Sequence, residues 1–208
     1  MSPRPKLTDV RRRQILDSAA AVIAERGIGD TRVADIAERI GVSAGLILYY
    51  FESKDALLGE ALAAKDREFF ENVTAEMDAA TSPAERIATL IEASCPSLGA
   101  DDATDDEYVL WIEVWSRARH DARLAEVRRE MDLHWRTAIA DLVAEGQKAG
   151  EFDTSVDADA FALRLAGLID GLAIQVILRD PDVTPAVMRD LCIEAAEKEL
   201  GTVLVSPG

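Results

Sequence analysis

The chain has 208 residues, of which 49% are hydrophobic, and it carries a formal net charge of −16 at pH 7. This length can bury a sizeable core, either in one domain or in a small domain joined to a larger one. No uninterrupted apolar run is long enough to cross a bilayer, and the N-terminus lacks the apolar segment of a secretory signal, so we expect a folded cytoplasmic protein. The two cysteines, Cys95 and Cys192, fit no metal-binding spacing, and we expect reduced thiols rather than a disulfide framework.

The negative charge is unevenly distributed. Residues 1–54 hold nine Lys or Arg and seven Asp or Glu, whereas the other 154 residues hold 14 and 32. The cations of the first thirteen residues, which face only Asp9, are Arg4, Lys6, Arg11, Arg12 and Arg13. A basic arm of this kind suits a DNA-binding protein, because neutralised phosphates release counterions, although a solubilising tail explains it equally well. The acidic remainder would repel DNA and so help to orient the N-terminal part towards it.

The first predicted helix covers residues 9–26. Ile15, Ala19, Val22 and Ile23 form one apolar stripe opposite charged residues, and Gly27 is expected to end the helix. Such an amphipathic helix can brace the pair of helices that follows.

Residues 31–54 predict two short helices joined by a tight turn. Thr31 is the expected N-cap of the first, and Gly41 supplies the left-handed conformation that the turn needs. Ser43 is the expected N-cap of the second, which covers residues 44–51 and buries Ile47 on one face. Two helices joined by a glycine turn are typical of the helix-turn-helix, although a core hairpin in an all-α protein has the same pattern.

The rest of the chain is also predicted to be helical. Ser53 is the expected N-cap of a long helix to about Met77, and Pro83 suits the first position of the next helix. The further predicted helices cover residues 84–97, 108–119, 121–149, 157–178 and 185–200, with an acidic loop over 101–107. We therefore expect an all-α fold of about nine helices, with a three-helix domain over residues 1–52 and a larger helical domain over residues 53–208.

The helix pair closely resembles the DNA-binding signature of the TetR family of one-component bacterial transcription regulators. The residues that carry the resemblance are Ile36-Ala37, Gly41-Val42-Ser43, Gly45, Tyr49-Tyr50-Phe51, Ser53-Lys54 and Leu57. The second half resembles the C-terminal domain of the TetR branch that includes choline-sensing repressors, in the segments LWIEVWSRARHD, EGQKAGEFD and GLIDGLAIQ. The resemblance implies that the long helix from Ser53 transmits the effect of ligand binding to the DNA-binding domains. Leu46 and Leu48 depart from the family pattern, which makes base preference harder to infer.

Several residues are DNA-binding candidates. Thr31, Ser43, Tyr49 and Lys54 match family positions that touch the DNA backbone, and helix N-termini also present free N–H groups to phosphates. The other candidates are Arg4, Lys6, Arg32, Ala44, Gly45, Leu46 and Leu48. The exposed residues of the second helix are nearly all apolar and can contact a thymine methyl but cannot make bidentate hydrogen bonds to bases. Specificity is therefore expected from the arm, Arg32, backbone contacts or DNA shape.

The second half offers candidates for a ligand pocket and for a dimer interface. The pocket candidates are mainly aromatic, namely Phe70, Val73, Met77, Tyr108, Trp111, Trp115, Met131, His134, Trp135 and Phe161. Plain core packing explains an aromatic stripe equally well, and a cationic ligand would suit the tryptophans. The interface candidates are Leu163, Gly167, Gly171 and Ile174 on one helix and Met188, Leu191, Cys192 and Ala195 on the next, with burial inside one subunit as the alternative.

The sequence as a whole predicts a repressor that binds a near-palindromic operator as a homodimer and responds to an unknown small-molecule effector. A dimer is expected because one short recognition helix covers too little DNA. The alternative is a helical ligand-binding or adaptor dimer without operator binding. No catalytic group or metal-ligand spacing is recognisable, so we expect neither an enzyme nor a cofactor.

Overall fold

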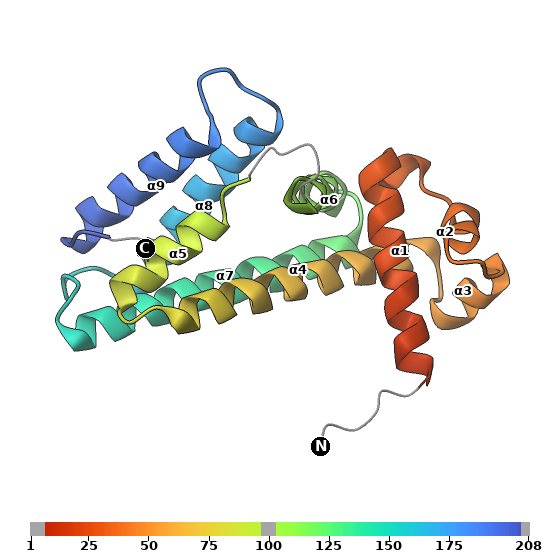
Figure 1. The fold of residues 1–208 in the computed structure, drawn as a ribbon, viewed down its shortest axis with the longest axis horizontal. Helices are drawn as coiled ribbons and strands as arrows, with labels where there is room; N and C mark the ends of the chain where they lie inside the picture. Colours follow the sequence, from red (N-terminus) through yellow and green to blue (C-terminus); the bar gives the residue numbers. More distant parts are fainter. Residues whose placement is uncertain (1–6, 97–102, 205–208) are drawn as a thin grey trace. The chain divides into compact units, whose positions relative to one another are not determined.

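A computed structural model of the chain describes residues 7–96 and 103–204, and over these residues it contains nine α-helices and no strand (Figure 1). The helices are α1 (Leu7–Asp30), α2 (Val33–Arg39), α3 (Ala44–Tyr50), α4 (Lys54–Ala79), α5 (Pro83–Ala93), α6 (Ala103–Ala118), α7 (Ala122–Ala149), α8 (Ala158–Ile177) and α9 (Pro185–Leu200). The predicted all-α fold is confirmed.

The chain divides into two compact units. We call Met1–Arg67 with Val109–Arg129 the N-terminal unit, and Glu68–Tyr108 with Glu130–Gly208 the C-terminal unit. Helices α4, α6 and α7 therefore contribute residues to both units. The domain boundary expected after residue 52 stays a prediction.

Local hydrogen bonds fix most helix ends. The Ser43 hydroxyl accepts a hydrogen bond from Leu46 N at 3.2 Å, and the Ser53 hydroxyl accepts one from Ala56 N at 3.1 Å, so both predicted N-caps are confirmed. Gly41 has φ of +66°, as the predicted left-handed turn requires. These bonds satisfy backbone groups that a helix end otherwise leaves without partners.

The predicted N-cap at Thr31 and the predicted acidic loop are wrong. Thr31 does not cap α2, because its hydroxyl donates to the Gly27 carbonyl at 2.8 Å, and Arg32 occupies the N-cap position instead. The segment 101–107, expected to be an acidic loop, is helical from Ala103 onwards as the start of α6. Acidic residues are favourable in the first turn of a helix because of the helix dipole, so their clustering does not require a loop.

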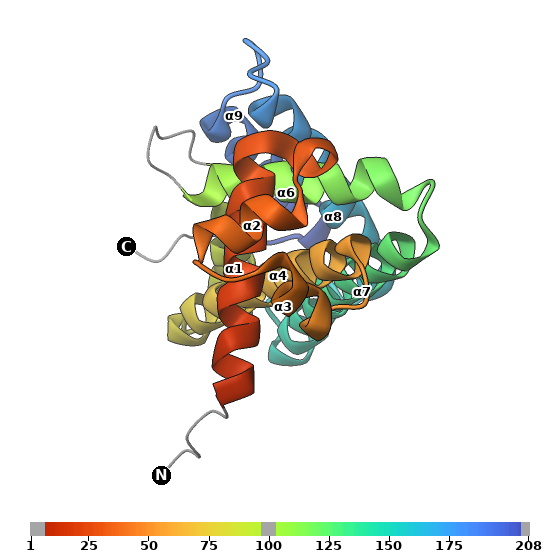
Figure 2. The same ribbon diagram turned by 90° about the vertical axis from the view of Figure 1, so that its right-hand side faces the viewer.

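The N-terminal unit is built around α1. Figure 2 shows α2 and α3 beside α1. Their shared core contains Ile15, Ala19, Val22, Ile36, Ala37, Ile47 and Phe51, together with Leu57 and Ala61 of α4. A second cluster joins α1 and α4 to α6 through Ala20, Ile23, Leu58, Leu62, Leu110 and Val114. The start of α4 is therefore buried on two faces.

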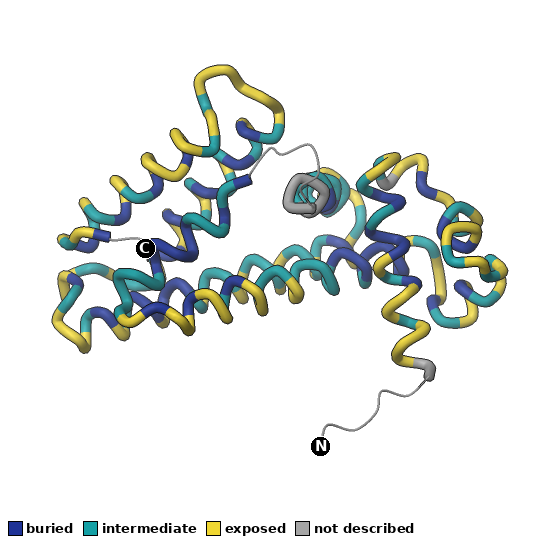
Figure 3. The backbone as a smooth tube through the Cα atoms, in the orientation of Figure 1, coloured by how far each residue is buried: buried dark blue, intermediate teal, exposed yellow. Residues whose placement is uncertain are grey.

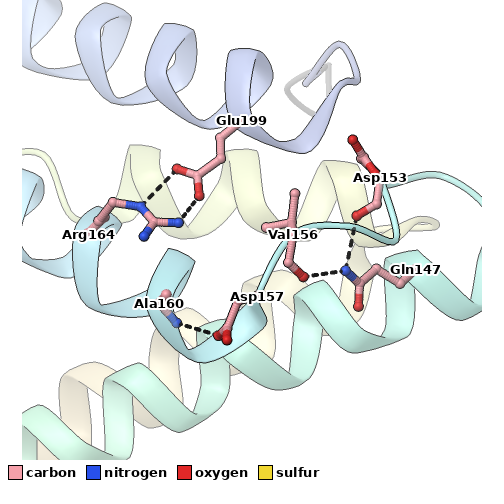
Figure 4. A network of polar contacts seen from close by, with 7 residues as sticks. All are labelled: Gln147, Asp153, Val156, Asp157, Ala160, Arg164 and Glu199. Carbon is pink, nitrogen blue, oxygen red and sulfur yellow. Dashed lines mark hydrogen bonds and ion pairs between the residues drawn. The ribbon is translucent and has the colours of Figure 1, made fainter.

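The C-terminal unit has the largest core, contributed by α5, α8 and α9 with parts of α4 and α7 (Figure 3). Figure 4 shows the polar network at the end of α7, where the Gln147 side-chain amide donates to the carbonyls of Asp153 at 3.0 Å and Val156 at 2.8 Å. In the same view Arg164 of α8 forms an ion pair with Glu199 of α9. Gln147 thereby holds the backbone of the connector between α7 and α8 at Asp153 and Val156.

Both cysteines lie in the C-terminal unit and are free thiols. Burial raises the pKa of Cys95 to about 11 and that of Cys192 to about 12. Since the thiolate is the reactive form, both groups are unreactive at neutral pH.

Gly146 of α7 provides a test of packing in the C-terminal unit. A Cβ atom at this position would lie 2.1 Å from Cδ2 of the buried Phe152 ring. We expect Gly146→Ala to lower the free energy of unfolding by about 1–3 kcal/mol, because the ring has to shift. The measurement is denaturant unfolding followed by circular dichroism.

Gly45→Ala is the matched control, because a Cβ there would meet nothing closer than 3.9 Å. Alanine in a helix is favoured over glycine by about 0.5–1 kcal/mol, so this variant is expected to be slightly more stable. Equal stability of the two variants would contradict the packing assigned to Gly146.

Candidate nucleic-acid interface and effector residues

The turn between α2 and α3 presents one face of α3 outward. Ile47 of α3 is fully buried, whereas Leu48 is 48% exposed and Tyr49 83% exposed. Gly45 is exposed, and Ala44 and Leu46 are half-buried. The residues predicted to read bases are thus together on one short helix, with Ser43 at its N-terminus.

The predicted phosphate contacts differ in exposure. Arg32 is exposed at the start of α2, Ser43 is exposed at the start of α3, and Lys54 is half-buried at the start of α4. Thr31 has no exposed surface, and its hydroxyl is already donated to Gly27, so it is not available to a phosphate in this conformation. Arg4 and Lys6 lie outside the described residues.

The aromatic pocket candidates fall into two clusters, one in each unit. In the N-terminal unit, the Trp111 and Trp115 ring centroids lie 4.6 Å apart, and the Arg128 guanidinium lies 4.4 Å from the centre of the Trp115 ring. The Trp115 Nε1–H is buried without an acceptor among the described atoms. The ring therefore offers a face that attracts a cation and an N–H that can donate.

The second cluster lies in the C-terminal unit. Phe70 of α4 stacks on His134 of α7, with ring centroids 3.9 Å apart, and meets Trp135 edge-on at 4.8 Å. Phe69 also contacts Trp135, with centroids 5.6 Å apart. The Tyr108 hydroxyl donates to the Ser94 carbonyl.

The other pocket candidates differ in their degree of burial. Val73, Met77 and Phe161 are buried in the core, and Met131 is half-buried. Sequence reasoning missed Phe69, which contacts Trp135 beside Phe70, and Arg128, for which the sequence carried no signal.

The interface candidates on α8 and α9 also separate into two groups. Leu163, Gly167, Gly171, Leu191 and Ala195 are exposed, Ile174 is half-buried, and a Cβ added at Gly167 or Gly171 would meet nothing within 4 Å. Met188 and Cys192 are fully buried inside the subunit, which is the alternative that the sequence had left open for the interface candidates. They point into the core because they lie on the side of α9 that packs against the rest of the unit.

Helix α8 is unusually apolar. Among the described helices it is the one whose length and composition would allow it to cross a membrane. The expectation that no uninterrupted apolar run is long enough to cross a bilayer is not contradicted, because charged residues interrupt this helix. Arg164 and Asp170 lie within the helix, and charged residues are costly inside a bilayer.

Comparison with known proteins agrees with this architecture. Residues 15–61 match the family model described as bacterial regulatory proteins, tetR family, and residues 83–201 match the BetI-type transcriptional repressor, C-terminal. The HTH-type transcriptional regulator BetI of Rhizobium meliloti is 30% identical over 182 residues, covering 88% of this chain and 85% of the relative. That of Cronobacter sakazakii is 28% identical and covers 95% of both chains.

A solved structure is similar throughout. The transcriptional regulator from Saccharomonospora viridis, determined in complex with choline, is 33% identical and superposes with a TM-score of 0.81 over 91% of this chain and 96% of that one. The capped helix pair with its outward face, joined to a helical C-terminal unit, defines a helix-turn-helix transcription regulator. The chain belongs to the TetR family of bacterial transcriptional regulators, with a BetI-type C-terminal region.

Lys54 provides a test of the nucleic-acid interface. Lys54→Ala is expected to weaken binding to all duplexes alike and to lower the slope of log affinity against log salt by about one for each subunit, because one phosphate contact is lost. The measurement is fluorescence anisotropy of a labelled duplex over a range of salt concentrations.

Lys148→Ala is the matched control, since it removes an exposed lysine of the C-terminal unit. It should leave the slope unchanged. An unchanged slope for Lys54→Ala as well would remove Lys54 from the interface.

Proposed function

We propose that the protein is a cytoplasmic repressor that binds a near-palindromic operator as a homodimer and is released by a small organic cation. The observation that carries the operator proposal is the outward face of α3, where Leu48 and Tyr49 are exposed beside the capped N-terminus at Ser43. A helix end of this kind favours phosphate, and the adjoining side chains can enter a major groove.

Base reading by this helix is expected to be mainly apolar. Leu46 and Leu48 can contact thymine methyl groups but cannot form bidentate hydrogen bonds with guanine or adenine. Operator preference therefore depends on Arg32, the basic arm and the sequence-dependent shape of the DNA.

The exposed apolar side of α8 and α9 supports a homodimer. Leu163 is 57% exposed in the single chain, and the open space beside Gly167 and Gly171 permits close approach of another helix. An exposed apolar stripe is unfavourable in water unless a partner covers it. A second copy is the partner that also supplies a second α3 for the other half-site.

The aromatic clusters support a cationic effector. Arg128 lies over one face of the Trp115 ring at 4.4 Å, which shows that the indole attracts a positive charge, and an effector cation would use another aromatic face of the clusters. The choline in the structure of the Saccharomonospora viridis relative belongs to the same chemical class. Quaternary ammonium compounds are therefore the first effectors to test.

The dimer proposal predicts that Leu163→Arg gives a folded monomer. A charge within the proposed interface would be desolvated without a partner, whereas the residue is exposed in the single subunit and tolerates the change there. Light scattering after gel filtration gives the mass. Leu133→Arg, which alters an exposed leucine of α7 in the same way, is expected to stay dimeric. A wild-type mass equal to one chain would overturn the proposal.

The operator and effector proposals are tested together by footprinting DNA that flanks the coding region. We expect a protected near-palindrome, and we expect choline to weaken this protection while its neutral isostere 3,3-dimethylbutan-1-ol does not, because only the cation gains from the aromatic faces. Equal effects of the two compounds would argue against cation recognition. Absence of any protected segment would favour the helical ligand-binding dimer without operator binding.

A further inference from the structure

Arg12 of α1 differs from the two arginines beside it. Arg11 and Arg13 are exposed, whereas the Arg12 side chain is 38% exposed and makes contacts within the N-terminal unit. Its charge is therefore not simply part of the basic arm.

The Arg12 guanidinium contacts three residues from two other elements and the turn between them. Its Nη1 donates to the Tyr50 carbonyl at 3.1 Å, its Nη2 forms an ion pair with Glu60 of α4, and its Cζ lies 4.5 Å from the centre of the Phe51 ring. Tyr50 is the last residue of α3, so its carbonyl has no partner within the helix and lies at the negative end of the helix dipole. Arg12 thus caps the C-terminus of the recognition helix.

The Arg12 guanidinium links α3 to α4, because it contacts both the Tyr50 carbonyl and the Glu60 carboxylate. A planar guanidinium can donate in two directions at once, which a lysine ammonium on a flexible stem does less well. Phe51, the C-cap residue of α3, is 2% exposed and lies under the guanidinium. The end of α3 is therefore held to α4 through Arg12 on one side and through buried apolar contacts on the other.

The backbone of α4 beside Glu60 is closely packed against α7. A Cβ added at the buried Gly59 would lie 3.3 Å from Leu124 Cδ2 and 4.0 Å from Val127 Cγ2. The next residue of α7, Arg128, is the one that lies over the Trp115 ring. Gly59 of α4 therefore packs against the start of α7, and the adjacent Glu60 pairs with Arg12.

We propose that Arg12 and Glu60 are positioning residues for operator binding, which set the orientation of α3 according to the position of α4. The close packing of Gly59 against Leu124 and Val127 holds this turn of α4 against α7, so the ion pair ties the C-terminal end of α3 to a well-packed part of the N-terminal unit. Arg12 is then not a phosphate contact. This inference rests on the DNA binding proposed above.

The Glu60→Gln variant separates this inference from simple electrostatics. Removing a negative charge from a DNA-binding unit strengthens binding to phosphates if charge alone matters. If Glu60 holds Arg12 in place, the same change weakens binding to the footprinted duplex by about fivefold, with the salt slope unchanged. Glu52→Gln is the matched control, since Glu52 is exposed between α3 and α4.

A double-mutant cycle tests whether the two residues act as one unit. Arg12→Met keeps an unbranched apolar stem over Phe51, and we expect Glu60→Gln to have no further effect on duplex affinity in that background. Circular dichroism melts give the temperature range in which every variant is folded, and affinities are compared within it. Hydrogen exchange of the peptide containing α3 provides a measurement without DNA, and both single variants are expected to exchange faster there than wild type.

The inference is supported if Glu60→Gln weakens duplex binding, Glu52→Gln does not, and α3 exchanges faster in the Arg12 and Glu60 variants. It is overturned if Glu60→Gln strengthens binding as Glu52→Gln does, if Arg12→Met lowers the salt slope, or if α3 exchange is unchanged. A wild-type protein with no duplex preference would instead contradict the proposed function, and the exchange measurement would still decide the positioning role.

Discussion

The whole N-terminal unit depends on the burial of one side of α3. This helix has only seven residues, and helices of that length are not stable in water by themselves. It exists because Ile47 and Phe51 are buried against α1, α2 and α4. The same seven residues leave Leu48 and Tyr49 exposed on the opposite side. The core and the predicted DNA-reading face are therefore two sides of one helix.

The charges of the N-terminal unit have different tasks despite their similar appearance in the sequence. Arg12 pairs with Glu60, Arg26 with Asp35 and Arg39 with Glu25, so each of these cations has a carboxylate beside it. Arg11, Arg13 and Arg32 remain exposed. Counting basic residues thus overstates the charge that the unit can offer to phosphates. The acidic composition of the rest of the chain makes the surviving exposed cations more important for orienting the protein on DNA.

The C-terminal unit illustrates why an apolar helix cannot be assigned from its composition alone. One side of α8 carries Leu165 and Ile169 into the core, while another leaves Leu163 and Gly167 exposed in the single chain. Core burial, a subunit interface and a membrane all select apolar residues, so the hydrophobic pattern predicts a helix with more than one buried side but not what covers each side. The exposed apolar stripe became visible only when the neighbours of α8 were known.

The sequence by itself determined the features that depend on contacts within a few residues of the chain. Gly41 specifies the turn through its left-handed backbone conformation, and Ser43 specifies the start of α3 because its hydroxyl accepts a hydrogen bond from Leu46 N. The all-α fold follows from the spacing of apolar residues. Only the tertiary structure decided how side chains distant in sequence are partnered. Thr31 is a local exception, because it has a capping residue's chemistry but its hydroxyl donates to the Gly27 carbonyl four residues earlier. Met188 belongs to the core rather than to an exposed face, and Arg12 belongs to the end of α3 rather than to the arm. Local geometry is encoded by neighbouring residues, whereas burial and ion pairing depend on which segments the fold brings together.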